Sequence, residues 1–177
     1  MFWENFWPNF ISTLIGVFVA GILSALTILW QIKKQNTSIY ISTLKTLLVE
    51  VADNKKTMLE GEKFKLIMGD IKHELLMTEF SKIALDGALS SERLNHINSD
   101  KITNKLLMHS KKIYMHNITE AMIISNLGIF TSDKPEFLNW LIENLNEKQL
   151  LLTVDFDMII DALTVEILKY DKTTHIN

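Results

Sequence analysis

The chain lacks cysteine altogether and has few residues that break regular structure. Its 177 residues include two prolines and six glycines, and its formal net charge is −3. Without cysteine there is no disulfide framework and no thiolate for a zinc cluster or a nucleophile. So little proline and glycine excludes collagen-like and low-complexity classes. The weakly acidic charge argues against a general nucleic-acid binder, so direct RNA binding is not expected.

Charge is missing from one long stretch, because no Asp, Glu, Lys or Arg occurs from Asn5 to Ile32. The 24 residues from Asn9 to Ile32 would form a helix of about 36 Å, enough to cross a hydrocarbon core of ~30 Å. A cleaved signal peptide has a basic start and a shorter apolar run, whereas Glu4 is the charged residue here. A buried core helix is the other alternative. We predict a transmembrane helix within residues 1–34, followed by a separate domain over residues 35–177.

Aromatic and basic residues flank the apolar run. Trp3 and Trp7 precede it, Trp30 stands at its other end, and Lys33 and Lys34 follow. Tryptophan is enriched at both membrane interfaces, and lysine binds anionic headgroups, so these five residues are predicted to contact lipid headgroups. Lysine follows the run and does not precede it. The positive-inside rule therefore places the N-terminus outside and the following domain in the cytoplasm.

Small and hydroxyl side chains recur along the predicted transmembrane helix at four-residue spacing. Such residues let helices approach closely in lipid, which favours an oligomer contact or a pore-lining face. A ring, a dimer and a contact with another protein all fit, and small residues are also common in membrane helices without any partner. The candidate residues are Ser12, Thr13, Gly16, Ala20, Gly21, Ser24, Ala25 and Thr27.

The rest of the chain has apolar residues at three- and four-residue spacing, which predicts helices. Either the first of them continues the membrane helix or a kink at Asn36–Ser38 separates the two. A short helix is expected near Leu94 and Ile97, and the run Leu150–Val154 is assigned to helix because a lone strand has no partner. No alternating strand pattern is recognised. The fold class is all-α: one transmembrane helix followed by a cytoplasmic bundle of roughly five helices, over 38–59, 64–83, 102–124, 137–145 and 155–170.

Motifs for catalysis or metal binding are nearly absent from the sequence. There is no glycine-rich phosphate loop and no HExxH pair, so neither a cofactor nor a metal is expected. Three carboxylates occur close together at Asp155, Asp157 and Asp161. We interpret them as favourable partners of a helix dipole at a helix start, in preference to a metal site.

Two histidines fall on one predicted apolar stripe, seven residues apart at His109 and His116. Either they are hydrogen-bonded core residues, or they serve as general acid–base groups of a helical RNase. Such a nuclease needs an arginine shortly before the histidine, and Asn104 takes that place before His109. The only arginine, Arg93, stands too close to His96 for that spacing.

In layout the chain resembles the small membrane accessory proteins encoded beside the RNA-guided RNase of type VI-B CRISPR systems. The matching features are the length, the single N-terminal helix NFISTLIGVFVAGILSALTILW and the helical domain after it. The resemblance implies a HEPN-like bundle, a ring-like homo-oligomeric pore in the bacterial inner membrane, and a functional link to that RNase in antiviral defence. The HEPN arginine is missing, since Asn104 is the nearest fit before His109, which favours a scaffold over a nuclease.

Three hypotheses follow. The chain forms a membrane pore without a catalytic site, or it is a membrane-tethered RNase that uses His109 or His116, or it is an adaptor that holds a partner at the membrane. Enlarging Gly16 and Ala20 distinguishes the first from the third, because only an assembled ring depends on close helix approach.

Overall fold

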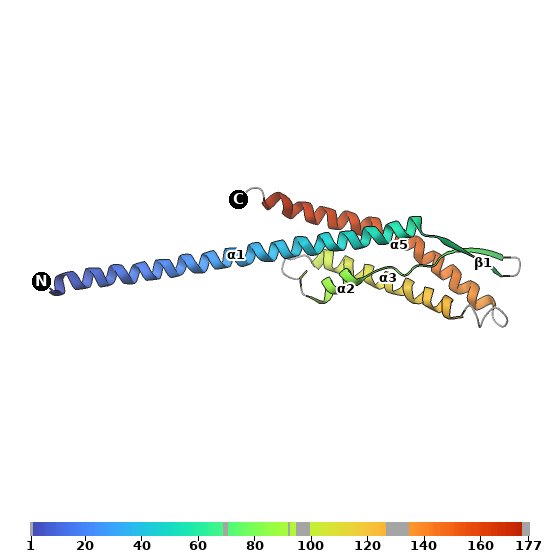
Figure 1. The fold of residues 1–177 in the computed structure, drawn as a ribbon, viewed down its shortest axis with the longest axis horizontal. Coiled ribbons are helices and arrows are strands. Elements are labelled where there is room, and N and C mark those ends of the chain that lie inside the picture. The colour runs from blue at the N-terminus through green and yellow to red at the C-terminus, as the bar shows by residue number, and fades with distance from the viewer. Residues whose placement is uncertain (1, 69–70, 92, 95–99, 127–134, 175–177) are drawn as a thin grey trace. The chain divides into compact units, whose positions relative to one another are not determined.

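A computed structural model describes the backbone of residues 2–68, 71–91, 93–94, 100–126 and 135–174, and the side chains of 6–66, 72–91, 93–94, 101–125 and 136–170. The chain divides into two compact units, Met1–Ile39 and Tyr40–Asn177. The predicted helical class is confirmed for the described residues. The elements, shown in Figure 1, are α1 (Phe2–Glu60), β1 (Lys63–Met68), β2 (Ile71–Leu76), α2 (Ile83–Ser90), α3 (Asp100–Asn126) and α5 (Pro135–Thr174).

Helix α1 runs without interruption from the apolar N-terminal run into the second unit. The helix is therefore continuous through Asn36–Ser38, as in the first of the two predicted alternatives. The Thr37 hydroxyl donates a hydrogen bond to the carbonyl of Lys33 at 2.9 Å, which satisfies this polar side chain inside the helix. The helix begins at Phe2, and Pro8 lies within its second turn.

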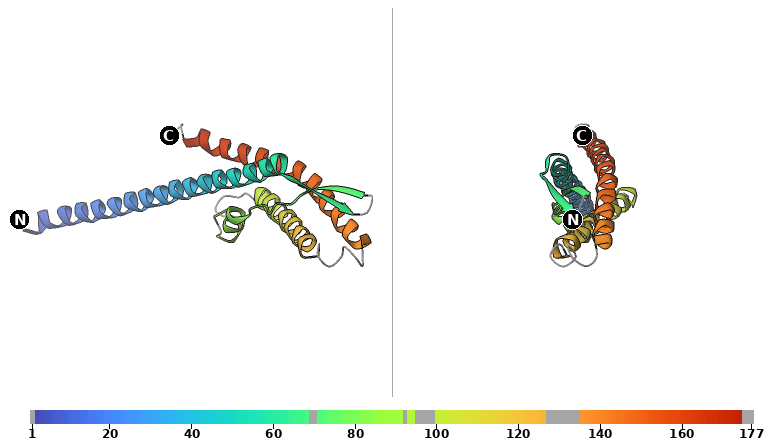
Figure 2. Two further views of the ribbon diagram at one scale, coloured as in Figure 1. Left: turned by 45° about the vertical axis from the view of Figure 1, so that its right-hand side comes forward. Right: turned by 90° about the vertical axis from the view of Figure 1, so that its right-hand side faces the viewer.

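The helix predicted over residues 64–83 is wrong, because this part of the chain forms an antiparallel β-hairpin (Figure 2). In its register Phe64 lies opposite Leu75 and Leu66 lies opposite His73. Leu75 is buried against the first half of α5, and Leu66 packs at the edge of the same cluster. Leu76, on the other face of β2, is buried in the main core, so the hairpin is stabilised by packing on both faces, as a two-stranded sheet requires.

Helix α3 agrees with the helix predicted over residues 102–124 and extends from Asp100 to Asn126. Helix α2 was not predicted as a helix of its own, because it begins at Ile83, where the predicted range 64–83 ends, and continues to Ser90. Leu94 is buried in a turn and not in a helix, while Ile97, the other residue of the predicted short helix, lies outside the described residues.

Helix α5 combines the two C-terminal helices predicted separately. It begins at Pro135, a residue that suits a first helical turn because it needs no N–H there. The run Leu150–Val154 is helical, as preferred over a strand. Helices α3 and α5 pack along each other within the Tyr40–Asn177 unit.

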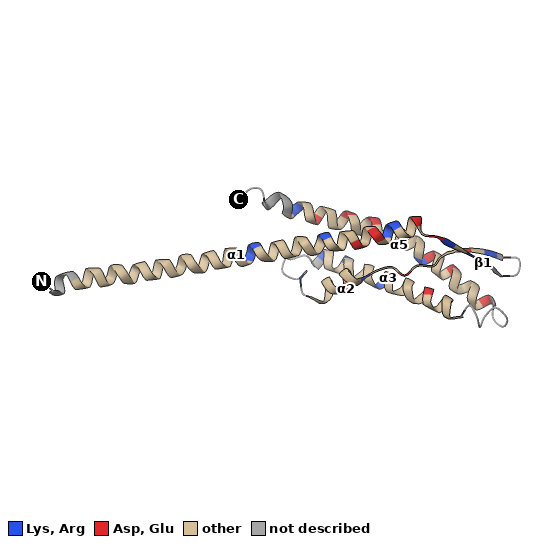
Figure 3. Ribbon diagram, viewed as in Figure 1, with Lys and Arg blue, Asp and Glu red and all other residues tan. Residues whose placement is uncertain are grey.

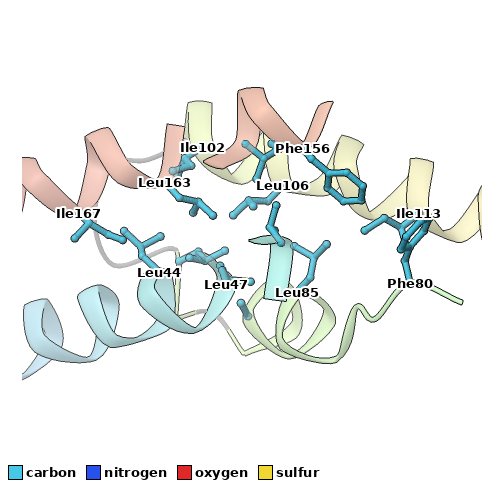
Figure 4. Close-up of a cluster of buried hydrophobic side chains, with 14 of the residues drawn as sticks. Leu44, Leu47, Phe80, Leu85, Ile102, Leu106, Ile113, Phe156, Leu163 and Ile167 are labelled. Carbon is cyan, nitrogen blue, oxygen red and sulfur yellow. The ribbon is translucent and has the colours of Figure 1, made fainter. Parts of the chain in front are cut away.

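The main core of this unit lies between the second part of α1, α2, α3 and α5 (Figure 4). Leu44 and Leu47 of α1 point toward Leu106 of α3 and Leu163 of α5, and all four are buried. Burying one leucine side chain contributes roughly 1.5–3 kcal/mol, so this interlocking set supplies much of the stability of the unit. The histidines of α3 lie along the same buried face.

Candidate functional site

The N-terminal part of α1 presents apolar side chains all around and buries none of them in the chain. The stretch Phe6–Glu60 contains a window long and apolar enough to cross a membrane, and 0% of that window is buried. No Asp, Glu, Lys or Arg occurs from Asn5 to Ile32, and in Figure 3 the ribbon of α1 has a long stretch without red or blue after its grey start. A core helix of a soluble protein passes the same length test but is buried, which this helix is not. A signal sequence passes the test as well.

Tryptophan side chains mark both ends of the apolar stretch. Trp7 and Trp30 are 54% and 58% exposed. At about 1.5 Å per residue, they lie roughly 35 Å apart along the helix, close to the distance between the two interfaces of a bilayer. The Lys34 ammonium lies 5.1 Å from the centre of the Trp30 ring, so the two side chains lie at the same height along the helix and make a cation–π contact. Lys33 is exposed beside them, and the Trp3 side chain lies outside the described residues.

The small residues of this helix fall into two groups. At 100° per residue, Ser12, Thr13, Gly16, Ala20, Ser24 and Thr27 share one face about 120° wide, whereas Gly21 and Ala25 lie on the adjacent face. All are exposed. A Cβ atom at Gly16 or Gly21 would meet nothing within 4 Å, so the chain itself makes no use of the missing side chain.

The hydroxyl groups on this face differ in their partners. Thr13 and Thr27 donate to the carbonyls of Asn9 and Leu23, both at 2.8 Å, and are satisfied by their own helix. Ser12 and Ser24 make no side-chain hydrogen bond within the described part of the chain. Two of the four predicted hydroxyl groups are therefore available to water or to another molecule.

His109 belongs to a buried ion-paired group. Its Nδ1 donates to Asp155 Oδ2 at 2.5 Å, and the Lys112 ammonium binds the other oxygen of that carboxylate. The imidazole is 0% exposed and Asp155 is 4% exposed. Burial acts to raise the pKa of Asp155, but the hydrogen bonds and charges of His109 and Lys112 outweigh it and lower that pKa. The other ring nitrogen, Nε2, has no hydrogen-bond partner among the residues that the structure describes.

His116 lies two turns further along α3, and its imidazole is also fully buried. Its Nε2 is 3.2 Å from Gln149 Nε2 and its Nδ1 is 3.3 Å from Asn117 Oδ1. Burial lowers the pKa of this imidazole, so the neutral form is favoured. Glu120, one turn later, is 5% exposed, and burial followed by the nearby charge of Glu79 raises its pKa to about 7.

The predicted nuclease residues do not share a surface. Asn104 is exposed and lies about 140° around α3 from His109, whose ring is buried. Both histidines have hydrogen-bond partners in the core, which favours the core-histidine interpretation. The catalytic role of Asn104, His109 and His116 stays a prediction.

The helix-dipole interpretation of the aspartates is wrong. Asp155, Asp157 and Asp161 lie in the middle of α5, which begins at Pro135, so no helix start is near them. Asp155 is buried to pair with His109, whereas Asp157 binds Lys55 of α1 at the surface. Among the side chains that the structure describes, no group of three His, Cys, Asp or Glu could hold a metal ion.

Four polar side chains that the sequence analysis did not single out hold the β2–α2 linker (residues 77–82). Asn54 binds both backbone groups of Ser81, donating to its carbonyl at 2.6 Å and accepting from its N–H at 2.9 Å. Asn117 does the same for Phe80, at 2.9 Å and 3.2 Å. Glu50 accepts from the N–H groups of residues 84 and 85, which caps α2. Gln149, the fourth, donates to the last carbonyl of β2 at 2.7 Å.

One signal for these residues was present in the sequence. Asn54 continues the apolar stripe of Leu47 and Val51 at three-residue spacing, and a polar residue on a core stripe is expected to be hydrogen bonded. Its partner at Ser81 stands 27 residues away, and nothing in the spacing points to that residue.

Comparison with protein-family models, curated proteins and solved structures gives no match to this chain. The exposed apolar helix with its small-residue face and the buried His109 group are the two candidate functional features among the described residues.

Proposed function

We propose that this chain is a single-pass membrane protein that assembles with copies of itself into a pore through its N-terminal helix. The observation that carries the proposal is the complete exposure of a membrane-length apolar helix. Large exposed apolar surface is rare in monomeric soluble proteins and marks contact with lipid or protein. In this proposal the N-terminus lies outside, and residues 35–177 lie in the cytoplasm, beside the bacterial inner membrane.

Self-association is supported by the face that includes Gly16 and Ala20. In lipid, helices associate by close packing at small residues, since apolar surface alone gives no preference for protein over lipid tails. The structure describes one apolar helix of this kind, so the face would meet another molecule. A second copy is the partner that the chain itself supplies.

Pore formation is supported by two unpaired hydroxyl groups on that face. Ser12 and Ser24 stand three turns apart on the helix, and an unsatisfied polar group in lipid costs free energy. In a ring, such hydroxyls can face water in the lumen, while the apolar side chains between them form a hydrophobic gate that wets and dewets.

The proposed biological role follows from the resemblance to accessory proteins of type VI-B CRISPR systems. In that role the pore depolarises the membrane of an infected cell once the RNA-guided RNase has recognised its target, and this strengthens the defence. The cytoplasmic unit would then be a scaffold that receives the signal, with no direct binding of RNA.

The test is the mass of the full chain in detergent, measured by light scattering, followed by dye release from vesicles that contain it. We expect a large homo-oligomer and release of small dyes. Changing Gly16→Leu and Ala20→Leu together should abolish both, because bulky side chains separate the helices. The matched control, Phe18→Leu with Ile22→Leu on the opposite face, should leave both intact. A monomeric wild-type chain would contradict the proposal.

One observation favours the RNase alternative, namely that the buried Nε2 of His109 has no hydrogen-bond partner. A free imidazole nitrogen is what a general base requires, although this one has no access to solvent. If the chain cleaves RNA, changing His109→Ala and His116→Ala together should abolish cleavage. Wild-type protein without RNase activity removes this alternative. An adaptor would retain its function with Gly16→Leu and Ala20→Leu.

A further inference from the structure

The outer surface of the Tyr40–Asn177 unit has an apolar stripe on α5 that none of the residues described by the structure covers. Its members follow three- and four-residue spacing and lie on the helix face opposite the core. Each is more than half exposed: Leu151 56%, Val154 58%, Met158 52%, Val165 67% and Leu168 51%. These five residues are called the α5 stripe below. Such spacing is that of a helix that packs against another helix.

A second stripe lies on the outer face of α3, again opposite the core. It comprises Met108, Lys111, Met115, Ile118 and Met122, with the three methionines 55%, 48% and 40% exposed. These residues are called the α3 stripe. Methionine is flexible and polarisable, and it is common on surfaces that bind other proteins.

Each stripe contains one charge, and the two charges are opposite. Asp161 falls between Met158 and Val165, while Lys111 falls between Met108 and Met115. Both charged side chains are exposed, and neither makes an ion pair or a hydrogen bond within the part of the chain that the structure describes. A single charge in an otherwise apolar stripe selects its partner, because a mismatched contact would leave that charge unpaired.

We propose that the α5 stripe of one copy packs against the α3 stripe of a second copy of this chain, with Lys111 opposite Asp161. The spacing on the two helices is the same, so this alignment brings Met108 and Met115 opposite Met158 and Val165, whichever way the helices run. Apolar positions then meet apolar positions on both sides of one ion pair.

The exposed area fits such a contact. At roughly 100 Å² for each half-exposed large side chain, the α5 stripe and the adjacent Leu150 offer on the order of 600 Å², about three quarters of the ~800 Å² that each partner contributes to a standard interface. Lipid is a poorer occupant than a second copy, because a membrane-surface helix flanks its apolar face with Lys and Arg, whereas this face holds Asp161.

This contact lies outside the membrane helix and goes beyond the proposed pore. The interface gives the cytoplasmic unit its own means of association, so copies can meet through two separate surfaces. Neither the conductance nor the defence role is needed for it.

The absence of cysteine allows a direct test on the full chain in detergent. One preparation carries Met115→Cys, and a second with a different tag carries Met158→Cys or Val165→Cys, which lie opposite Met115 in the antiparallel and the parallel alignment respectively. The two are mixed under mild oxidation. We expect a disulfide-linked heterodimer with one of the two α5 cysteines. Replacing Met115→Cys with Lys105→Cys, which lies on α3 outside the stripe, should give no heterodimer. Equal yields with Met115→Cys and Lys105→Cys, or no product with either α5 cysteine, would overturn the proposal.

Charge exchange provides the second test, in a background with Gly16→Leu and Ala20→Leu that removes the proposed membrane contact. Lys111→Glu or Asp161→Lys alone should raise the dissociation constant at least about 10-fold, because like charges then face each other. The two changes together should restore it to within about 3-fold of the background. The control Lys105→Glu should have no effect. Failure of the double change to restore association contradicts the Lys111–Asp161 pairing.

The two proposals can fail separately. Stripe-specific disulfides from a chain that releases no dye would support the interface and contradict the pore. Dye release from a chain that shows no stripe-specific disulfide and no effect of charge exchange would support the pore and contradict the interface.

Discussion

Asp155 on α5 and His109 on α3 are joined by a hydrogen bond of 2.5 Å inside the core, 46 residues apart in the chain. The same carboxylate binds Lys112, so one buried acid holds two basic side chains. Forming such a group removes the Asp155 carboxylate and the His109 ring from water, and loss of one of them leaves the other buried without its partner at large cost. The group therefore fixes how α3 and α5 align more than it adds to net stability.

Loss of that acid is expected to destabilise the unit strongly. Changing Asp155→Ala should lower the free energy of unfolding by about 3–5 kcal/mol, because His109 and Lys112 lose their acceptor. The matched control is Asp157→Ala, which removes an exposed pair with Lys55 and should cost about 0–1 kcal/mol. Chemical unfolding of the full chain in detergent, followed by circular dichroism, measures both. Equal losses would show that the buried group has no special role.

Stability should fall as pH rises through the titration of Glu120. Its pKa is about 7 in the folded chain against an ordinary value of 4.5, so between these values the unfolded chain ionises and the folded chain does not. Stability is then full below pH 4.5 and falls by up to about 3 kcal/mol by pH 7. Replacing Glu120→Gln should abolish this loss, which unfolding at a series of pH values measures.

The contribution of His116 has the opposite sign. Its pKa is lowered in the folded chain, so the unfolded chain gains a proton first and stability falls as pH drops through the ordinary value of 6.5.

Glu79→Gln provides a control for the Glu120 effect, because removing that neighbouring charge should lower the pKa of Glu120 and reduce the loss only in part. A wild-type profile identical to that of Glu120→Gln would contradict the assignment.

Two glycines should respond oppositely to alanine. A Cβ at Gly61 would lie 2.5 Å from the carbonyl oxygen of Thr57 and 2.4 Å from a methyl of Leu76, so Gly61→Ala should destabilise by roughly 1–3 kcal/mol. At Gly87, inside α2, a Cβ meets nothing within 4 Å, and Gly87→Ala should stabilise by roughly 0.5–1 kcal/mol. Thermal unfolding ranks the two variants against wild type. A reversed order would mean that the hairpin does not close against Gly61 as described.

The tautomer of His116 is fixed by its neighbours. The Gln149 amide donates to Nε2 of the ring, so the proton resides on Nδ1, which donates to Asn117. We expect imidazole ¹⁵N chemical shifts at pH 7 to show a neutral ring with a protonated Nδ1. Changing Gln149→Glu should replace this donor with an acceptor and favour protonation of Nε2. A spectrum unaffected by the change would show that Gln149 does not hydrogen-bond to the His116 ring.

The long helices were predictable because their core residues repeat with one period. On α3, Ile102, Leu106 and Ile113 are all buried at the predicted positions, and the two histidines share their face. The membrane-length run needed only length and composition. In each case the signal is local to one helix, so no information about distant partners is required.

The hairpin was missed because its apolar residues fit two periods. Phe64, Ile67 and Ile71 have the three- and four-residue spacing of a helix, and Phe64 is 58% exposed, so no clean alternation marks the strand. In the sequence, the pair Gly69–Asp70 stands between the two runs, and such a pair indicates a hairpin turn more strongly than the periodicity indicates a helix.

The buried polar group could be predicted only in part. That His109 is a hydrogen-bonded core residue follows from its place on an apolar stripe. That its partner is Asp155 does not, since a contact over 46 residues depends on how α3 and α5 pack. The aspartate looked like a helix-start residue because the sequence suggested two helices where α5 is one.

Most buried backbone groups are hydrogen bonded within helices or sheets. In the β2–α2 linker, side-chain amides form these hydrogen bonds instead. Asn54 and Asn117 each use the NH₂ group to bind a linker carbonyl, at Ser81 and Phe80. Spontaneous deamidation would convert either residue to aspartate, with nearly the same shape but with an oxygen where the donor was. Two acceptors would then face each other in the core. The native linker therefore depends on these two side chains remaining amides.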